Sequence, residues 1–93
     1  MGVLHLVNST EGLGRCRDRL GPDDAVILLE AGVYTAMAPS GKPEGMDVDL
    51  FVLQEHLSQR GIARTRVRPA FTLINFEGFV GLTVRHTRSV TWA

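Results

Sequence analysis

The chain has 93 residues, 44% of them hydrophobic, and its ten basic and ten acidic side chains give a formal net charge of zero. This length suits a single small domain, a single cysteine excludes an internal disulfide framework, and no apolar run is long enough to span a membrane. The first residues lack the basic and apolar regions of a signal peptide, so we expect a cytoplasmic protein. A domain this small with so much apolar sequence is expected to complete its burial by self-association.

The charged residues are unevenly distributed along the chain. Residues 1–58 carry a net charge of −5 and residues 59–93 a net charge of +5, and nine of the ten basic residues are arginine. Arginine suits bidentate contacts to carboxylates and phosphates. The bipolar distribution has two interpretations at this point: a solvated surface, or a patch that docks a partner or faces RNA.

The first elements are predicted from short apolar patterns. Residues 3–7 predict a strand, and His5 within it is expected to be a hydrogen-bonded core or interface residue rather than a catalyst. Residues 11–20 predict a helix, because three of their side chains fall on one helical face: Leu13, Cys16 and Leu20. A glycine and a proline follow, and they mark the end of this helix.

The stretch 25–29, Ala-Val-Ile-Leu-Leu, predicts the central strand. It is an unbroken apolar run, whereas a strand with one face in water would alternate apolar and polar residues. We therefore expect it to be covered on both faces, as in a parallel sheet between two helical layers. The sequence turns polar at Glu30 and small at Gly32, and functional groups gather at this end of a strand in open α/β sheets.

The rest of the chain continues to alternate between strand and helix patterns. Apolar residues after Gly32 predict a short helix, and residues 39–45 predict a loop. The elements expected further on are a strand at 48–53, a helix at 54–60, an extended segment at 64–69, a strand at 71–74, a helix at 77–86 and a strand at 89–92. This pattern predicts a single three-layer α/β/α domain over residues 1–93, with a mostly parallel sheet of about five short strands.

The extended segment carries three arginines at alternate positions. An extended chain points alternate side chains to one side, so Arg64, Arg66 and Arg68 are expected to form one basic row. These three residues are candidates for contact with RNA or with an acidic partner, and ordinary surface charge is the alternative.

The sequence lacks the common catalytic and cofactor templates. It has no dinucleotide-binding glycine pattern, no P-loop lysine and no nucleophile elbow. Its histidines and its cysteine also lack the spacing of metal ligands. We therefore expect neither a cofactor nor a metal ion.

Cys16 is the one residue able to carry sulfur chemistry, and two interpretations of it remain open. Its place on an apolar helical face favours a buried, inert thiol. The two glycines early in this helix favour the opposite, because a delayed helix start would place Cys16 in the first turn. Free N–H groups and three neighbouring arginines would stabilise a thiolate there.

The order and spacing of several segments resemble the DsrE/DsrF/DsrH-like sulfur-relay proteins, and within them the small DsrH/TusB branch. The resemblance covers nearly the whole chain. Its blocks are Leu4-His5, Asp24 to Ala36, Phe51 to Leu53, Leu57 to Gly61 and, most specifically, Phe79 to His86 followed by Trp92.

The resemblance implies a fold, an assembly and a function. The fold is the DsrEFH-like α/β domain. The assembly is a cytoplasmic heterohexamer with two copies each of this chain, a DsrE/TusD-like subunit and a DsrF/TusC-like subunit. The complex would pass persulfide sulfur toward 2-thiouridine at the tRNA wobble position, with a sulfur-carrier protein as a further partner, and this chain would meet tRNA only indirectly. The principal sulfur-carrying cysteine belongs to the DsrE/TusD-type partner, so this chain would be an accessory subunit.

The resemblance also marks individual residues. Some family members have a cysteine in the first helix, so Cys16 matches a secondary persulfide acceptor. Apart from the resemblance, the self-association expected of so apolar a small domain makes His86 and Trp92, near the end of the chain, the candidate interface residues. Packing within the subunit is the alternative for both.

Two segments depart from the family pattern. Asn8-Ser9-Thr10 stands where Lys-Ser-Pro is usual, and Asn75-Phe76 stands where Asp-Tyr is usual. Each departure affects either the interface with partner subunits or the assignment of the chain to a branch of the family. A DsrH-type subunit of a sulfur-oxidation complex therefore stays open, as does a stand-alone homo-oligomeric interaction domain without sulfur chemistry.

Overall fold

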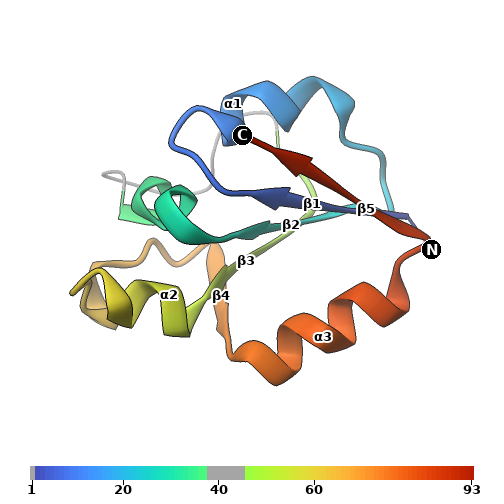
Figure 1. Ribbon diagram of the computed structural model, residues 1–93. Helices are drawn as coiled ribbons and strands as arrows, with labels where there is room; N and C mark the ends of the chain where they lie inside the picture. The colour runs from blue at the N-terminus through green and yellow to red at the C-terminus, as the bar shows by residue number, and fades with distance from the viewer. Residues whose placement is uncertain (1, 38–45) are drawn as a thin grey trace.

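The computed structural model describes residues 2–37 and 46–93, so the loop predicted at 39–45 lies outside the described residues. In the described part, five strands alternate with helices (Figure 1). The strands are β1 (Val3–Val7), β2 (Ala25–Leu28), β3 (Asp49–Leu53), β4 (Phe71–Ile74) and β5 (Arg88–Trp92). The α-helices are α1 (Gly12–Cys16), α2 (Gln54–Gln59) and α3 (Phe76–Arg85), and the 3₁₀ helices are η1 (Arg17–Arg19), η2 (Glu30–Met37) and η3 (Arg64–Arg66).

The strands form one sheet in the order β4-β3-β2-β1-β5, and every neighbouring pair in it is parallel. Strands β1 to β4 lie side by side in chain order. The chain then crosses the sheet through α3 and adds β5 on the other side of β1 (Figure 1). Because parallel crossovers are right-handed, this reversal of direction moves the connecting helix to the opposite face. The predicted α/β fold with a parallel sheet is confirmed.

Two apolar clusters cover the two faces of the sheet. On one face, the strands pack against side chains from α1, η2 and α2: Leu13, Cys16, Val33, Ala36 and Leu57. On the other face, the strands pack against Phe79 and Leu82 of α3. Figure 1 shows α1 and α3 on opposite sides of the sheet, which gives the three expected layers.

Strand β2 lies at the centre of the sheet, and all four of its residues are buried. Val26 and Leu28 belong to the first cluster, and Ala25 and Ile27 to the second. Two-sided burial is thus the reason for the unbroken apolar run, as predicted. Close packing continues past the strand, because a Cβ on Gly32 would lie only 2.1 Å from a backbone oxygen of β1.

The first helix differs from its prediction in length and in the position of Cys16. The Ser9 hydroxyl accepts a hydrogen bond from the Gly12 N–H at 3.0 Å, and α1 begins at Gly12 despite its glycines. Cys16 is therefore the last residue of α1, and the chain continues as η1. The prediction that Cys16 lies in the first helical turn is wrong.

The segment that carries the three arginines is not extended as predicted. Arg64–Arg66 form η3, closed by hydrogen bonds from the Arg66 N–H to Ala63 and from the Val67 N–H to Arg64, at 3.0 and 3.1 Å. These local backbone bonds bend the chain, so the argument that an extended segment aligns the arginines in one row is wrong.

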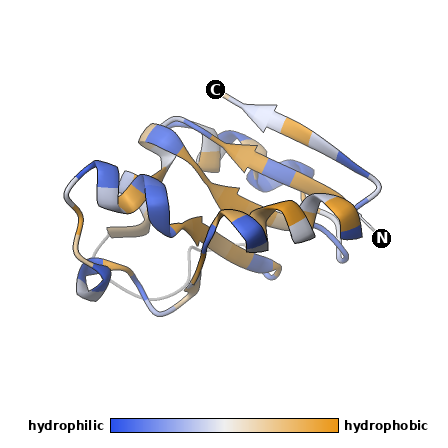
Figure 2. Ribbon diagram, turned by 60° about the horizontal axis from the view of Figure 1, so that its bottom comes forward, coloured by the Kyte–Doolittle hydropathy of each residue, from blue (hydrophilic) through white to orange (hydrophobic). Residues whose placement is uncertain are grey.

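Helix α3 agrees with its predicted range to within one residue. The Asn75 side chain caps it by accepting a hydrogen bond from the Gly78 N–H at 2.8 Å. Asn75, one of the residues that depart from the family pattern, is therefore a favourable helix cap. Figure 2, a view with the α3 side brought forward, shows that apolar residues recur along the helix.

Candidate functional site

Cys16 lies inside the larger apolar cluster. Its exposed fraction is 0%, and its thiol donates a hydrogen bond to the Leu13 carbonyl oxygen, with an Sγ–O distance of 3.4 Å. The three arginines that flank it in sequence are exposed on the surface. The helix therefore presents its cysteine to the core and its charges to water.

Burial raises the pKa of the Cys16 thiol to about 11, and a backbone hydrogen bond and the charge of Arg17 oppose this effect only in part. A thiol with a pKa near 11 rather than 9.0 carries about one hundredth as much thiolate at neutral pH. The thiolate is the nucleophile in persulfide transfer. The site thus favours a packed thiol over a sulfur carrier.

We predict that Cys16 is protected in the folded protein. At about pH 8, alkylation of the native chain should be at least about 100-fold slower than alkylation in denaturant, because both access and thiolate are lost on folding. Incubation with a persulfide donor should give no mass gain of about 32 Da. Alkylation at equal rates in the two states, or stoichiometric sulfur loading that Cys16→Ser abolishes, would contradict the prediction.

Trp92 is one end of a hydrogen-bonded chain that runs through His5 to Asp24. The Trp92 indole N–H donates to His5 Nδ1 at 2.9 Å, and His5 Nε2 lies 2.9 Å from Asp24 Oδ2. Because Nδ1 accepts the hydrogen bond from the indole, the ring proton is on Nε2, whose N–H donates a hydrogen bond to the carboxylate. His5 is only 3% exposed, so it is the hydrogen-bonded core residue that the sequence predicts.

Asp24 receives two further hydrogen bonds from the backbone. The N–H groups of Val3 and Gly21 each donate to its carboxylate at 2.9 Å. Burial by itself would raise the pKa of Asp24, but the backbone bonds and the contact with His5 outweigh it, and the pKa is lowered. The carboxylate therefore joins β1, β5 and the turn before β2 as an ionised acceptor.

The lowered pKa predicts how stability depends on pH. The folded-state pKa of Asp24 lies below its unfolded value, so its contribution is complete above about pH 4 and is lost as pH falls through the folded-state pKa. Asp24→Asn should lower the free energy of unfolding by about 1–3 kcal/mol at about pH 6. The deficit should shrink at about pH 3 in denaturant titrations.

The neighbouring Asp23 gives the matched control, because it is exposed and has no part in the hydrogen-bonded chain. Asp23→Asn should change the free energy of unfolding by less than about 0.5 kcal/mol at either pH. A deficit for Asp24→Asn that stays constant or grows toward acid pH would show that its carboxylate charge is not what stabilises the fold.

A second polar cluster lies where β2 and β3 end. The Glu30 N–H donates to His56 Nδ1 at 2.9 Å, and the Glu30 carboxylate lies 3.6 Å from His56 Nε2 and 3.5 Å from the Arg60 guanidinium. Arg60 also lies over the ring of Tyr34. Glu30 has a φ of 48°, a left-handed conformation that costs about 1 kcal/mol, and its bond to His56 helps hold it there.

Sequence analysis located Glu30 at this edge but did not assign its partners. The signal was present, because His56 and Arg60 follow β3 and parallel strands end at the same edge of a sheet. The cluster contains a carboxylate, an imidazole, a guanidinium and a phenol, and none of these four side chains is a thiol or a serine nucleophile. The contacts of this cluster join η2 to α2, and its polar groups are accessible to water.

The three arginines of the predicted basic row have different environments. Arg64 donates to the Gln54 side chain at 3.1 Å, and Arg66 is exposed. Arg68 is half-buried and donates to the carbonyl oxygen of Thr35 at 2.6 Å, so it joins the segment that precedes β4 to η2. Contact with RNA or with an acidic partner remains a prediction for these residues.

His86 directly follows α3. Its Nδ1 is 2.6 Å from the carbonyl oxygen of Leu82, a carbonyl in the last turn of α3, so the imidazole donates there. Its predicted interface role remains untested. Trp92 and Cys16 share the first apolar cluster, whereas His86 caps the helix on the opposite face.

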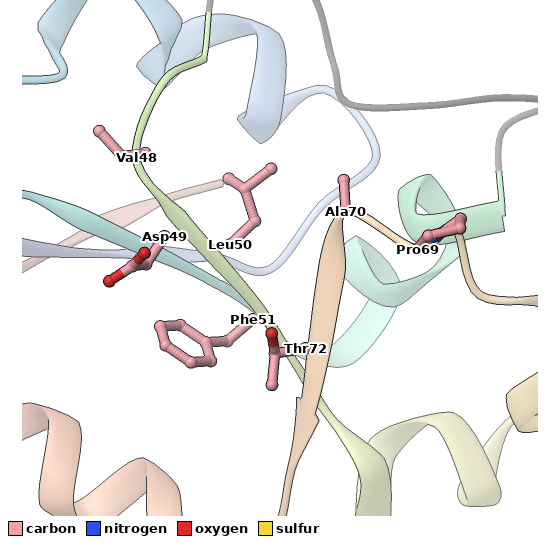
Figure 3. Close-up of a pocket in the computed structure, with 7 residues that line it drawn as sticks. All are labelled: Val48, Asp49, Leu50, Phe51, Pro69, Ala70 and Thr72. Carbon is pink, nitrogen blue, oxygen red and sulfur yellow. The ribbon is translucent and has the colours of Figure 1, made fainter.

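A hollow of about 480 Å³ opens beside β3 and β4 (Figure 3). Its lining residues are Val48, Asp49, Leu50, Phe51, Pro69, Ala70 and Thr72. Asp49 is the one ionisable group in this lining, and none of the candidate site residues Cys16, Arg64, Arg66, Arg68, His86 and Trp92 belongs to it. The hollow therefore has no catalytic set of residues.

Within residues 2–37 and 46–93, no three side chains of histidine, cysteine, aspartate or glutamate come close enough together to hold a metal ion. None of the helices in the described part of the chain has the length and apolar character needed to cross a membrane.

Comparison with known families agrees with the fold and with the order of the sequence blocks. Residues 7–89 match the family described as DsrH like protein. The match spans most of the chain, so the protein belongs to the DsrH-like family, within the sulfur-relay proteins that its sequence resembles.

Two individual relatives support the same family assignment. The chain is similar to Protein TusB of Yersinia pestis (strain Pestoides F) and to Protein TusB of Yersinia pseudotuberculosis (serotype O:1b, strain IP 31758). In each comparison 32% of 73 aligned residues are identical, and the alignment covers 75% of this chain and 76% of the relative.

Proposed function

We propose that this protein is a structural subunit of a cytoplasmic persulfide-relay complex that serves 2-thiolation of the tRNA wobble uridine. The observation that carries the proposal is the family match over residues 7–89. Relatives named TusB support the tRNA branch of the family, which is the branch that the sequence resemblance connects with 2-thiouridine.

The chemistry of the relay supports a sulfur-carrying role for another subunit. In each step an acceptor thiolate attacks the terminal sulfur of a donor persulfide, a new S–S bond forms, and the donor leaves as a thiolate. Cys16 is buried, and its thiol is protonated at neutral pH. These properties support an acceptor on a DsrE/TusD-like partner and an architectural role for this chain.

The proposed partners are a DsrE/TusD-like subunit and a DsrF/TusC-like subunit, assembled with this chain as a heterohexamer. A sulfur-carrier protein would exchange sulfur with the complex, and tRNA would contact this chain only indirectly. Exposed arginines at η3 and polar groups of the Glu30 cluster offer contacts of both charge signs for such assembly. Arginine and carboxylate pairs contribute to specificity and to association rate more than to affinity.

A second candidate function is a DsrH-type subunit in a sulfur-oxidation complex, and the matching family description favours it. The two candidates share the fold, the partner classes and the persulfide chemistry, and they differ in the final sulfur acceptor. A stand-alone homo-oligomeric domain is the third hypothesis, and it requires no related subunits.

Co-expression with the two related subunits of the same organism tests the assembly. The tagged chain should recover both subunits in equal amounts, because a subunit with no accessible thiol acts through its contacts. Deletion of its gene should then lower the 2-thiouridine content of tRNA, measured by nucleoside mass spectrometry, and a wild-type copy should restore it.

Each outcome separates the hypotheses. Intact 2-thiouridine together with lost sulfur oxidation would favour the DsrH-type function over the tRNA function. Failure to recover either related subunit, with normal tRNA and normal sulfur oxidation, would contradict both complexes and leave the stand-alone domain.

A further inference from the structure

Helix α3 leaves a row of apolar side chains largely exposed, although the Phe76 ring contacts Phe79 edge-on. Phe76, Val80 and Val84 are 57%, 49% and 79% exposed. They recur every fourth residue, so they lie along one side of the helix; we call them the outer row. Residues that face the sheet from the same helix, Phe79 and Leu82, already supply its packing against the second cluster.

Helix α3 is therefore apolar on two sides. A helix that packs on one sheet and otherwise faces water needs a single apolar stripe, with polar residues opposite. A second apolar side is typical of a helix that is buried between two neighbours. The sheet is one neighbour of α3, and the described chain supplies no second element that buries the outer row.

A second row runs beside the outer row and consists of Glu77, Gly81 and Arg85. A Cβ on Gly81 would meet no atom within 4 Å, so packing inside this chain does not require a glycine there. Glycine in the middle of a helix costs about 1 kcal/mol relative to alanine, but it allows another backbone to come close. The exposed Val80 lies directly next to this glycine.

The charges at the two ends of this second row have opposite signs. Glu77 lies in the first turn of α3 and Arg85 in its last turn, and both side chains are exposed. Neither forms an ion pair with another of the described residues. Both charges are therefore available to a partner.

We propose that the outer row is the contact between two copies of this chain, with the two α3 helices packed antiparallel about a two-fold axis near Gly81. This arrangement places Glu77 of each copy beside Arg85 of the other. It also brings Val80 of each copy against the backbone at Gly81, where the helices approach most closely. Rows of residues spaced by four interlock in the commonest class of helix packing.

The charge order is the reason for choosing a second copy as the occupant. An isologous contact must be self-complementary, because each residue meets its counterpart across the two-fold axis. A row with an acid at one end, a glycine at its centre and an arginine at the other end meets this requirement when the helices are antiparallel. The contact does not rest on the proposed sulfur-transfer function, and related subunits could still bind other faces.

Sedimentation of the full chain and of Gly81→Gln tests this contact. At roughly 10–100 µM the wild-type chain should sediment with twice its 10.2 kDa mass. The glutamine has room within the chain and favours a helix, but it keeps the two backbones apart. It should weaken dimerisation about tenfold or more, without a change in the circular dichroism spectrum.

Gly14→Gln is the matched control, because a Cβ at Gly14 of α1 also meets no atom within 4 Å. It should leave dimerisation unchanged. The charge pair gives a second measurement: Glu77→Arg alone should weaken the dimer, and adding Arg85→Glu should restore it, because the double variant reverses both charges.

Three results would overturn the proposal. The first is a wild-type chain that remains monomeric throughout this concentration range. The second is a Gly81→Gln chain that dimerises like the wild type, and the third is a double charge variant that fails to recover. A monomeric chain whose Gly81→Gln variant loses binding to a related subunit would assign the outer row to that subunit instead.

Discussion

The layout of the sheet depends on the hydrogen-bonded chain from Asp24 through His5 to Trp92. Strand β5 is an edge strand whose residues are half-buried or exposed, so apolar burial alone does little to hold it against β1. The indole N–H of Trp92 donates a hydrogen bond to the His5 imidazole, and the imidazole donates one to the Asp24 carboxylate. A buried polar network in which every group has a hydrogen-bond partner specifies one arrangement of the strands. Fixing β5 beside β1 also fixes the reversal of direction that carries α3 to the opposite face of the sheet.

With α3 on that face, the two sides of the sheet differ in what they bury and what they expose. The side covered by α1, η2 and α2 is a packed core that includes the cysteine, while α3 covers its own side and leaves a second apolar surface outward. A cysteine placed among leucines and valines keeps its proton, because burial penalises the charged thiolate. A buried thiol with a raised pKa and exposed surfaces for assembly support the proposal of a subunit that organises a relay and does not carry its sulfur.

Much of this fold could be predicted from the sequence, because two-sided burial produces an apolar run such as 25–29 and helical spacing marks α3. The 3₁₀ helix η3 could not be predicted, since local backbone hydrogen bonds at Arg66 and Val67 decide its shape. The hydrogen-bond partners of His5 could not be predicted either, because Asp24 and Trp92 lie 19 and 87 residues away along the chain. The two interpretations of Cys16 depended on where α1 begins, and the structure places this start at Gly12, whose N–H donates to the Ser9 hydroxyl. The resemblance located the family, while the exposure of each candidate residue required the structure.

The central claim is that this subunit contributes contacts and not a thiol. The most direct test is the rate of sulfur transfer through the reconstituted complex, with wild-type chain or with Cys16→Ala, from a persulfidated donor to the final acceptor. The account predicts rates within about twofold of each other, because a buried protonated thiol has no part in the exchange. Loss of transfer in a Cys16→Ala complex that assembles with normal mass and normal melting temperature would contradict it and would make Cys16 a member of the relay.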